Sequence, residues 1–394
     1  MIDFRNKCPI QKNNISYWIM YIGILIQALF VFWSVAAIHV GTILLIVGWL
    51  IKCFLNKKIE LPRKDLLMPI TLFLSICFLS VCINGDFSSG LKEWKSLFEL
   101  FFGYYLILNF IQSKHEIKVI LSALTFSSVL AAIYGIFQYF SGDIRAEGST
   151  TYMIFASGMM FAAIFNLNLF LAVVSLKKKI IYFTSLILNI LALIFTMTRG
   201  AWLAFIGALL CQSIFKERKV LILTVVLSLI LLLVPSIKER TQTIIDLKMH
   251  SNSERLCLWQ SSINMVKDHP FLGVGLGRFP KAYQEKYILE QAKERDLAHA
   301  HNNFFHYAAE LGIIGVMSFT YLLIAILRSC WVSCVNTKDK YLSRVSFSGL
   351  LCVLAFIIQG MTEFTFGASV TVRFLFLLIA LSLSTKYLLD SRYI

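Results

Sequence analysis

Apolar stretches of roughly 20 residues recur along nearly the whole chain, and they limit its fold more than any other feature. A stretch of this length is what an α-helix needs to cross the hydrocarbon core of a bilayer. Of the 394 residues, 58% are hydrophobic, which is more than soluble globular domains contain. We therefore expect an all-α polytopic membrane protein.

One crossing on each apolar stretch predicts about 12 transmembrane helices. The predicted spans are Ile15–Trp33, Val35–Leu55, Leu66–Ile83, Leu97–Ile111, Ile117–Phe140, Tyr152–Leu176, Ile180–Met197, Ala201–Phe215, Val220–Val234, Phe305–Leu327, Ser346–Thr362 and Ser369–Leu389.

Lys and Arg concentrate in every second connection between these spans, as in the Lys177–Lys179 run, and such connections stay on the cytoplasmic side. Both termini are therefore predicted to be inside. The long polar interval from 236 to 304 is predicted to be outside. The chain then divides into residues 1–235 with nine spans, this outside loop, and residues 305–394 with three spans. The net charge of +15 follows from this topology and not from a basic stripe, which argues against nucleic-acid binding.

The first half of the outside loop predicts surface helices. Ser236–His250 is expected to form a short amphipathic helix. A second helix is expected to start with Ser253 as its N-cap, and apolar residues at helical spacing predict that one of its faces is buried. That face consists of Leu256, Trp259, Ile263 and Val266.

A glycine-rich segment follows, in which Pro270 is expected to end the helix. Gly273, Gly275 and Gly277 permit backbone conformations that other residues avoid. Two interpretations stay open. The turn could cradle a phosphate through its N–H groups beside Arg278, or it could simply pack against membrane helices.

Three histidines lie within eight positions, at His299, His301 and His306, after a charged segment from Lys281 to Asp296 that is expected to be helical. Their spacing does not match a helical zinc site, and no carboxylate or cysteine ligand motif accompanies them. We therefore predict no metal, and expect a neutral imidazole to act as a general base.

Arg199 lies between two apolar spans with little loop around it. A charge at membrane depth is costly and usually has a functional partner, and a guanidinium matches the oxygens of a lipid phosphate. The alternative is that Arg199 extends to the outer headgroups. Glu310 is interpreted as its counter-ion, as a residue that orients the histidines, or as part of a plain ion pair.

Several short motifs, taken in order, resemble the O-antigen ligase and polymerase superfamily of bacterial inner membranes. They are Thr198-Arg199-Gly200-Ala201-Trp202-Leu203, Glu254-Arg255 followed by Trp259, His269-Pro270-Phe271-Leu272-Gly273-Val274-Gly275, and His301-Asn302 with Glu310-Leu311-Gly312 and Gly315. The long loop after the ninth span also matches the ligases.

The resemblance implies a membrane glycosyltransferase of GT-C-like architecture, with short helices in a long periplasmic loop. It implies an inverting transfer, without metal or other cofactor, of an undecaprenyl-pyrophosphate-linked glycan to the lipid A-core oligosaccharide. By position, Arg199, Arg255 and Arg278 would bind the pyrophosphate and His301 would be the base. His299, Asn302 and Glu310 would support the site, and His299 is not excluded as the base.

Two alternatives remain. An O-antigen polymerase of the same superfamily would use another undecaprenyl-linked glycan as its acceptor. A secondary transporter would also fit 12 spans, although it normally needs charged or broken helices near mid-membrane. The predicted spans contain few ionisable residues, and Arg373 and Glu363 lie near an outside turn.

Overall fold

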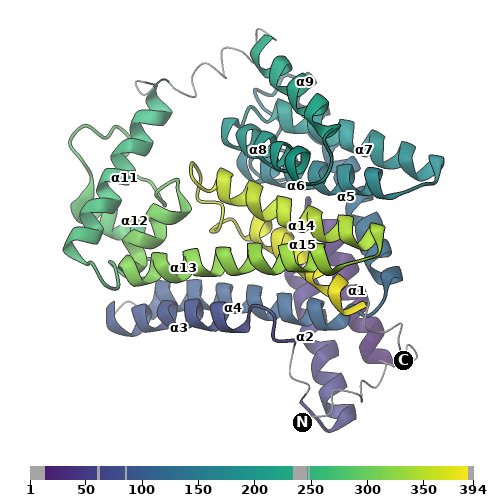
Figure 1. Cartoon of the computed structure of the whole chain (residues 1–394). Helices are drawn as coiled ribbons and strands as arrows, with labels where there is room; N and C mark the ends of the chain where they lie inside the picture. Colours follow the sequence, from purple (N-terminus) through teal and green to yellow (C-terminus); the bar gives the residue numbers. More distant parts are fainter. Residues whose placement is uncertain (1–13, 60–62, 85–86, 234–245, 247–248, 389–394) are drawn as a thin grey trace.

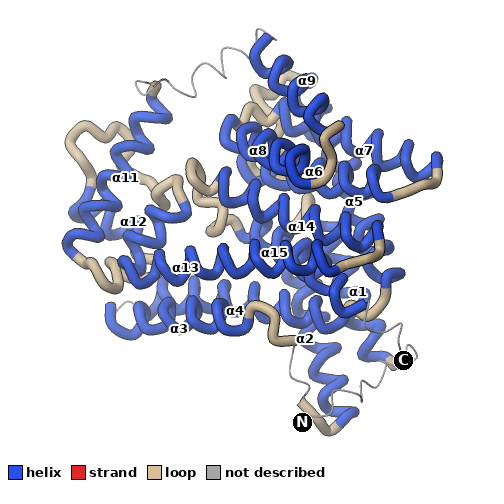
Figure 2. The backbone as a smooth tube through the Cα atoms, in the orientation of Figure 1, coloured by secondary structure: helices blue, strands red, loops and turns tan. Residues whose placement is uncertain are grey.

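The computed structural model describes residues 14–59, 63–84, 87–233, 246 and 249–388. Every regular element in these residues is helical, and Figure 2 accordingly draws blue helices and tan loops but no red strand. The first nine helices are α1 (Ile15–Phe30), α2 (Val35–Asn56), α3 (Leu67–Asn84), α4 (Phe87–Phe110), α5 (Lys114–Phe140), α6 (Tyr152–Ala172), α7 (Leu176–Phe195), α8 (Arg199–Phe215) and α9 (Val220–Leu233). They are followed by α11 (His250–Asp268), α12 (Phe279–Ala282), the π-helical turn η1 (Tyr283–Tyr287), α13 (Asn303–Asn336), α14 (Lys340–Gln359), α15 (Ser369–Ser384) and the 3₁₀ turn η2 (Thr385–Leu388).

Each of the 12 predicted spans coincides with one of these helices. Among the described helices, eight are long and apolar enough to cross a membrane, and α1, α8 and α9 are shorter apolar helices. The chain is thus a multi-pass membrane protein. The largest difference between a predicted and an observed helix end is at α4, which begins at Phe87 and not at Leu97. Its first turns are polar and therefore carry little hydropathy signal. The exact number of crossings stays a prediction.

The helices α6, α14 and α15 form the centre of the bundle, because most of each is buried inside the protein. By contrast, α2 and α3 expose most of their apolar residues, as expected for helices that face lipid. Figure 1 shows α13 running between the α3–α4 pair and the α14–α15 pair. The region of α11 and α12 extends beyond one end of this bundle (Figure 1).

Contacts between connections agree with the predicted alternation of sides. Segments predicted to be inside bind one another, as in the ion pairs of Lys114 with Asp339 and of Arg344 with Glu217. Segments predicted to be outside also bind one another, as where Asn303 donates from Nδ2 to Thr365 Oγ1. These contacts are therefore consistent with connections that alternate between the two ends of the bundle. Which end faces the cytoplasm stays a prediction.

The α13 helix is broken at Gly312, which has φ 66° and ψ −164°. The segment after Pro270 fits into this break. The Ile313 N–H donates to the Pro270 carbonyl at 2.8 Å, and the Val274 N–H donates to the Ala309 carbonyl at 2.9 Å. A Cβ on Gly312 would lie 2.4 Å from the Phe271 carbonyl carbon, so only glycine permits this approach.

The outside loop differs from its prediction in several places. The helix α11 begins at His250, so Ser253 lies inside the helix and is not its N-cap. The end at Asp268, directly before His269 and Pro270, is confirmed. Of the segment Lys281–Asp296, only the beginning is helical, in α12 and η1. Most of the predicted helix Ser236–His250, and the boundary at 235, lie outside the described residues.

The predicted buried face of α11 was also wrong, because Leu256 and Ile263 are exposed. The helix instead buries Glu254, which accepts the backbone N–H groups of Lys293 and Glu294 at 3.0–3.2 Å. A polar residue faces inward here because the irregular segment that leads to the histidines needs acceptors for its backbone donors.

Candidate functional site

Two charged or titratable side chains from distant parts of the chain meet at one carboxylate. Glu363, in the turn between α14 and α15, contacts the ring of His301 through Oε2, with 3.0 Å to Nδ1. Its other oxygen, Oε1, accepts a hydrogen bond from Nη2 of Arg255 on α11. The structure thus joins the predicted base to one of the predicted pyrophosphate-binding arginines through a residue that the sequence did not assign to the site.

The carboxylate of this cluster is covered while its partners are partly open. The Glu363 side chain is 7% exposed, whereas those of His301 and Arg255 are each 19% exposed. Burial alone would raise the pKa of Glu363, but the hydrogen bond from His301 and the charge of Arg255 outweigh it and lower that pKa below its usual value. Glu363 is therefore ionised at neutral pH.

The tautomer of the neutral His301 ring follows from this contact. An ionised carboxylate can only accept hydrogen bonds, so the proton of the neutral imidazole lies on Nδ1. The lone pair of Nε2 is then the one that can take a proton from a substrate. This is the arrangement in which a carboxylate orients a histidine as a general base.

The backbone also sets the position of His301. Its φ of 48° lies in the left-handed region, which costs roughly 1 kcal/mol for a residue with a side chain. The next residue, Asn302, is the N-cap of α13 and accepts the N–H groups of Phe304 and Phe305. Asn302 also donates from Nδ2 to the Met361 carbonyl at 2.7 Å, which ties this cap to the turn that carries Glu363.

His299 lies beside His301, with their ring centroids 4.4 Å apart. Burial, together with the nearby His301, lowers the pKa of His299 to about 4, so it is neutral at neutral pH. Its Nδ1 is buried and forms no hydrogen bond within the described part of the chain. His301 therefore fits the base role better, because it alone of the two has a carboxylate to stabilise its protonated form.

Arg199 reaches the beginning of α11. Its Nη2 donates to Ser251 Oγ at 3.0 Å and to Asn252 Oδ1 at 3.1 Å. Ser251 and Arg255 are four residues apart on the same helix, so they share a face. The structure therefore places the Arg199 guanidinium about one helical turn from the base of the Arg255 side chain.

Arg278 contacts the end of α3. Its Nη1 donates to the Asn84 carbonyl at 2.7 Å. Arg199 and Arg255 are thus linked through α11, while Arg278 is attached to α3. That all three bind one pyrophosphate stays a prediction.

Glu310 holds the glycine-rich turn and does not contact Arg199. It accepts the Phe279 N–H at 3.0 Å and a hydrogen bond from the Gly277 backbone, and His306 Nε2 lies 3.6 Å from it. The N–H groups of Val274 and Gly275 also bind α13 carbonyls. The structure therefore favours the packing interpretation of this turn over the phosphate cradle.

A second buried charged group lies within the bundle, where the sequence analysis expected few ionisable residues. Arg373 on α15 is 3.3 Å from the Glu99 carboxylate on α4, and His39 on α2 contacts the same carboxylate at 3.0 Å. This trio ties three helices together. Because each partner is supplied by the protein, we interpret it as structural.

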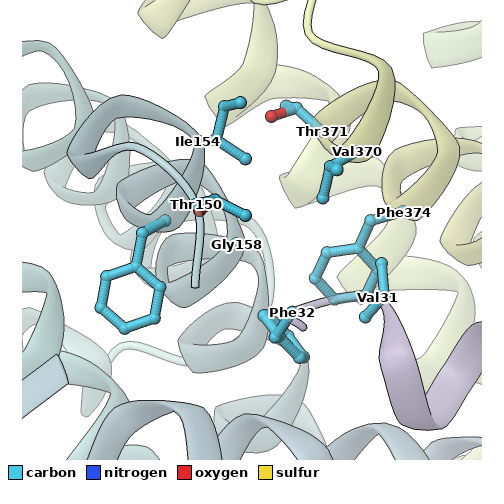
Figure 3. A pocket seen from close by; sticks show the side chains of 9 residues that line it. Val31, Phe32, Thr150, Ile154, Gly158, Val370, Thr371 and Phe374 are labelled. Carbon is cyan, nitrogen blue, oxygen red and sulfur yellow. The ribbon is translucent and has the colours of Figure 1, made fainter. Parts of the chain in front are cut away.

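Two hollows in the described structure differ in their lining. One is lined by apolar side chains and two threonines at the ends of α1, α6 and α15 (Figure 3), and it contains no titratable side chain. The other is lined in part by Glu93, Tyr307 and Arg373 of the trio. Within the described residues, no three His, Cys, Asp or Glu side chains could hold a metal ion together, and a metal-free reaction stays a prediction.

Comparison with known protein families gives a match over part of the chain. Residues 184–320 match the family described as O-antigen ligase. This match supports membership of the O-antigen ligase superfamily. This family covers ligases and polymerases, which are glycosyltransferase-like enzymes of O-antigen processing. No curated protein matches the chain. The matched region includes Arg199, Arg255, Arg278 and His301, while Glu363 lies outside it.

Glu363 is the residue of this candidate site that sequence reasoning missed. The sequence places Glu363 near an outside turn, but nothing in it connects this residue with a histidine 62 positions earlier. The available signal was a carboxylate in a short connection between two apolar spans. A charge in such a place usually has a specific partner.

Proposed function

We propose that this chain is an O-antigen ligase. It transfers a glycan from undecaprenyl pyrophosphate to the lipid A-core oligosaccharide at the periplasmic face of the inner membrane. The observation that supports the proposal is the Arg255–Glu363–His301 contact, because a guanidinium that could bind a phosphate leaving group and a histidine that could act as the base share one carboxylate. The family match supports the class of reaction.

In the proposed reaction, Nε2 of His301 removes the proton from a hydroxyl group of the acceptor sugar. The hydroxyl oxygen attacks the anomeric carbon of the donor while the bond from that carbon to the pyrophosphate oxygen breaks. The leaving group keeps the electron pair, so undecaprenyl pyrophosphate departs as an anion. Attack from the opposite face inverts the configuration at the anomeric carbon. Glu363 stabilises the imidazolium that forms on His301.

The arginines supply the charge that the leaving group needs. Nε of Arg255 is buried without a hydrogen bond in the described structure, although buried donors are normally satisfied. A phosphate oxygen would provide the missing acceptor. Arg199, one helical turn away, would bind the same pyrophosphate, and Arg278 would act only if the glycan or lipid extends toward α3.

The proposed function is tested by deleting the chain from its source strain and examining its lipopolysaccharide and its undecaprenyl-linked glycans. We expect bare core lipopolysaccharide, with full-length polymer accumulating on undecaprenyl pyrophosphate. A core that carries a single repeat unit would instead identify the polymerase. Unchanged lipopolysaccharide would reject both enzymes.

The Arg199→Lys variant is expected to lose about tenfold to a hundredfold in transfer rate, as for the loss of one charged hydrogen bond. A lysine keeps the charge but not the planar fork that matches phosphate oxygens. The measurement is transfer by the purified variant in lipid nanodiscs. The control is the Ser251→Ala/Asn252→Ala double variant, which removes two hydrogen bonds that tie Arg199 to α11. An equal loss in this control would assign Arg199 to holding α11 and not to the donor.

Purified wild-type enzyme is expected to keep its full transfer rate in excess chelator, because side chains supply every charge in the proposed mechanism. The measurement is transfer after dialysis against EDTA, with activity after added Zn²⁺ or Mg²⁺ as the comparison. A loss that a metal restores would overturn the metal-free mechanism.

A further inference from the structure

Asn303 fastens the turn that carries Glu363, which we call the Glu363 turn (Gly360–Ala368). The backbone N–H of Asn303 donates to the Gly360 carbonyl at 2.8 Å. Its Nδ2 donates to Thr365 Oγ1 at 3.0 Å, and its Oδ1 accepts the Phe366 N–H at 3.0 Å. The residue is 1% exposed, so water does not replace these bonds easily.

These three bonds lie on both sides of Glu363. Gly360 comes before it in the chain, whereas Thr365 and Phe366 come after it. A Cβ on Gly360 would lie 2.2 Å from Asn303 Nδ2, so the close approach at this end depends on glycine. The Glu363 turn is therefore attached at both ends to one residue, at Gly360 by the backbone N–H of Asn303 and at Thr365 and Phe366 by its side chain.

The same short segment carries the base. Asn303 follows His301 by two residues, and the intervening Asn302 is the N-cap of α13. The segment that holds the imidazole thus also holds the turn with the carboxylate that orients it. A displacement of either part by about 1 Å would break the 3.0 Å contact between His301 and Glu363.

We propose that Asn303 is a positioning residue that fixes Glu363 against His301. This inference rests on the proposed function for its catalytic consequence, but the attachment of the turn does not depend on it. Asn303 itself does not touch the reacting groups. It acts through Glu363, by keeping the carboxylate at hydrogen-bond distance from Nδ1.

The catalytic part is tested with three variants of the full chain in nanodiscs. They are Asn303→Leu, which removes both side-chain bonds at similar volume, Thr365→Val, which removes one of them, and Asn168→Leu as the control. Asn168 is an equally buried asparagine that bonds to Ile164 and Gln212 in another part of the bundle. Donor and acceptor are the lipid-linked glycan and core lipopolysaccharide extracted from the deletion strain.

We expect Asn303→Leu to lower kcat about tenfold to a hundredfold with little change in the KM for the donor. Thr365→Val should lower kcat less, and Asn168→Leu should not change the kcat of the folded protein. In a Glu363→Gln background, Asn303→Leu should cause no further loss, because its effect passes through the missing carboxylate. A further loss of the same size in that background would overturn the proposal.

The attachment itself is tested by amide hydrogen exchange, which needs no substrate. In Asn303→Leu, exchange at Phe366 and its neighbours in the Glu363 turn should become faster, while exchange in α6 and α15 stays as in the wild type. Unchanged exchange in the turn would overturn the attachment even if activity falls. If the wild type transfers no glycan, the proposed function fails, and this exchange measurement alone decides whether Asn303 holds the turn. If Asn303→Leu does not fold, Thr365→Val gives the same two readouts.

Discussion

Replacing His301 with alanine is expected to abolish glycan transfer while the protein remains folded in the membrane. Loss of a general base typically slows a reaction by about a hundredfold to ten-thousandfold. The measurement is transfer in nanodiscs from the lipid-linked donor to core lipopolysaccharide. Full activity of His301→Ala would exclude His301 as the base.

Two control variants make this result specific. His301→Asn keeps a residue that tolerates the left-handed backbone at φ 48°, so it separates loss of the imidazole from backbone strain. We expect it to be as inactive as His301→Ala. His299→Ala should keep more activity, because His299 has no carboxylate partner. If His299→Ala is instead the less active of the two alanine variants, the base role passes to His299.

Glu363→Gln is expected to have the second-largest effect, a loss of about a hundredfold to ten-thousandfold in kcat. The amide keeps the shape of the side chain but no longer fixes the proton on Nδ1 of His301, and it cannot stabilise an imidazolium. It also leaves Arg255 without its counter-ion. The measurement is single-turnover transfer at saturating donor, which separates chemistry from binding.

The matched control for this prediction is Glu310→Gln, which changes another buried carboxylate in the outer part of the protein. Glu310 binds the glycine-rich turn and not His301, so its substitution should lower stability more than kcat. If Glu310→Gln and Glu363→Gln have the same kcat, the effect is a general one of removing a buried charge, and the specific role of Glu363 is rejected.

The pH dependence gives an independent check. Because folding lowers the pKa of Glu363, its ionised form contributes stability above the ordinary value of 4.5, and this contribution is lost as the pH falls below it. Infrared difference spectra between the wild type and Glu363→Gln should therefore show an ionised carboxylate from about pH 6 to 8. A protonated carboxyl band should appear only when the pH falls below 4.5. Such a band near pH 7 would contradict this assignment.

The sequence predicted the helices well because the bilayer imposes one length and one composition on every crossing. It was less successful in the outside loop, where no such constraint applies. The inward face of α11 carries Glu254 together with Leu258 and Met265, and not the predicted apolar set, because this helix also packs against backbone donors of the next segment. Hydrophobic periodicity detects apolar packing and has no signal for such contacts.

By itself, the sequence determined the all-helical membrane fold, the alternation of sides, and the candidate residues Arg199, Arg255 and His301, since these depend on composition and local motifs. Only the tertiary structure decided which residues meet. It joined Arg255 and His301 through Glu363, attached Arg278 to the end of α3, and attached the Glu363 turn to Asn303. These contacts cross between helices that are far apart along the chain. Their geometry depends on how the whole bundle packs, which no local pattern in the sequence records.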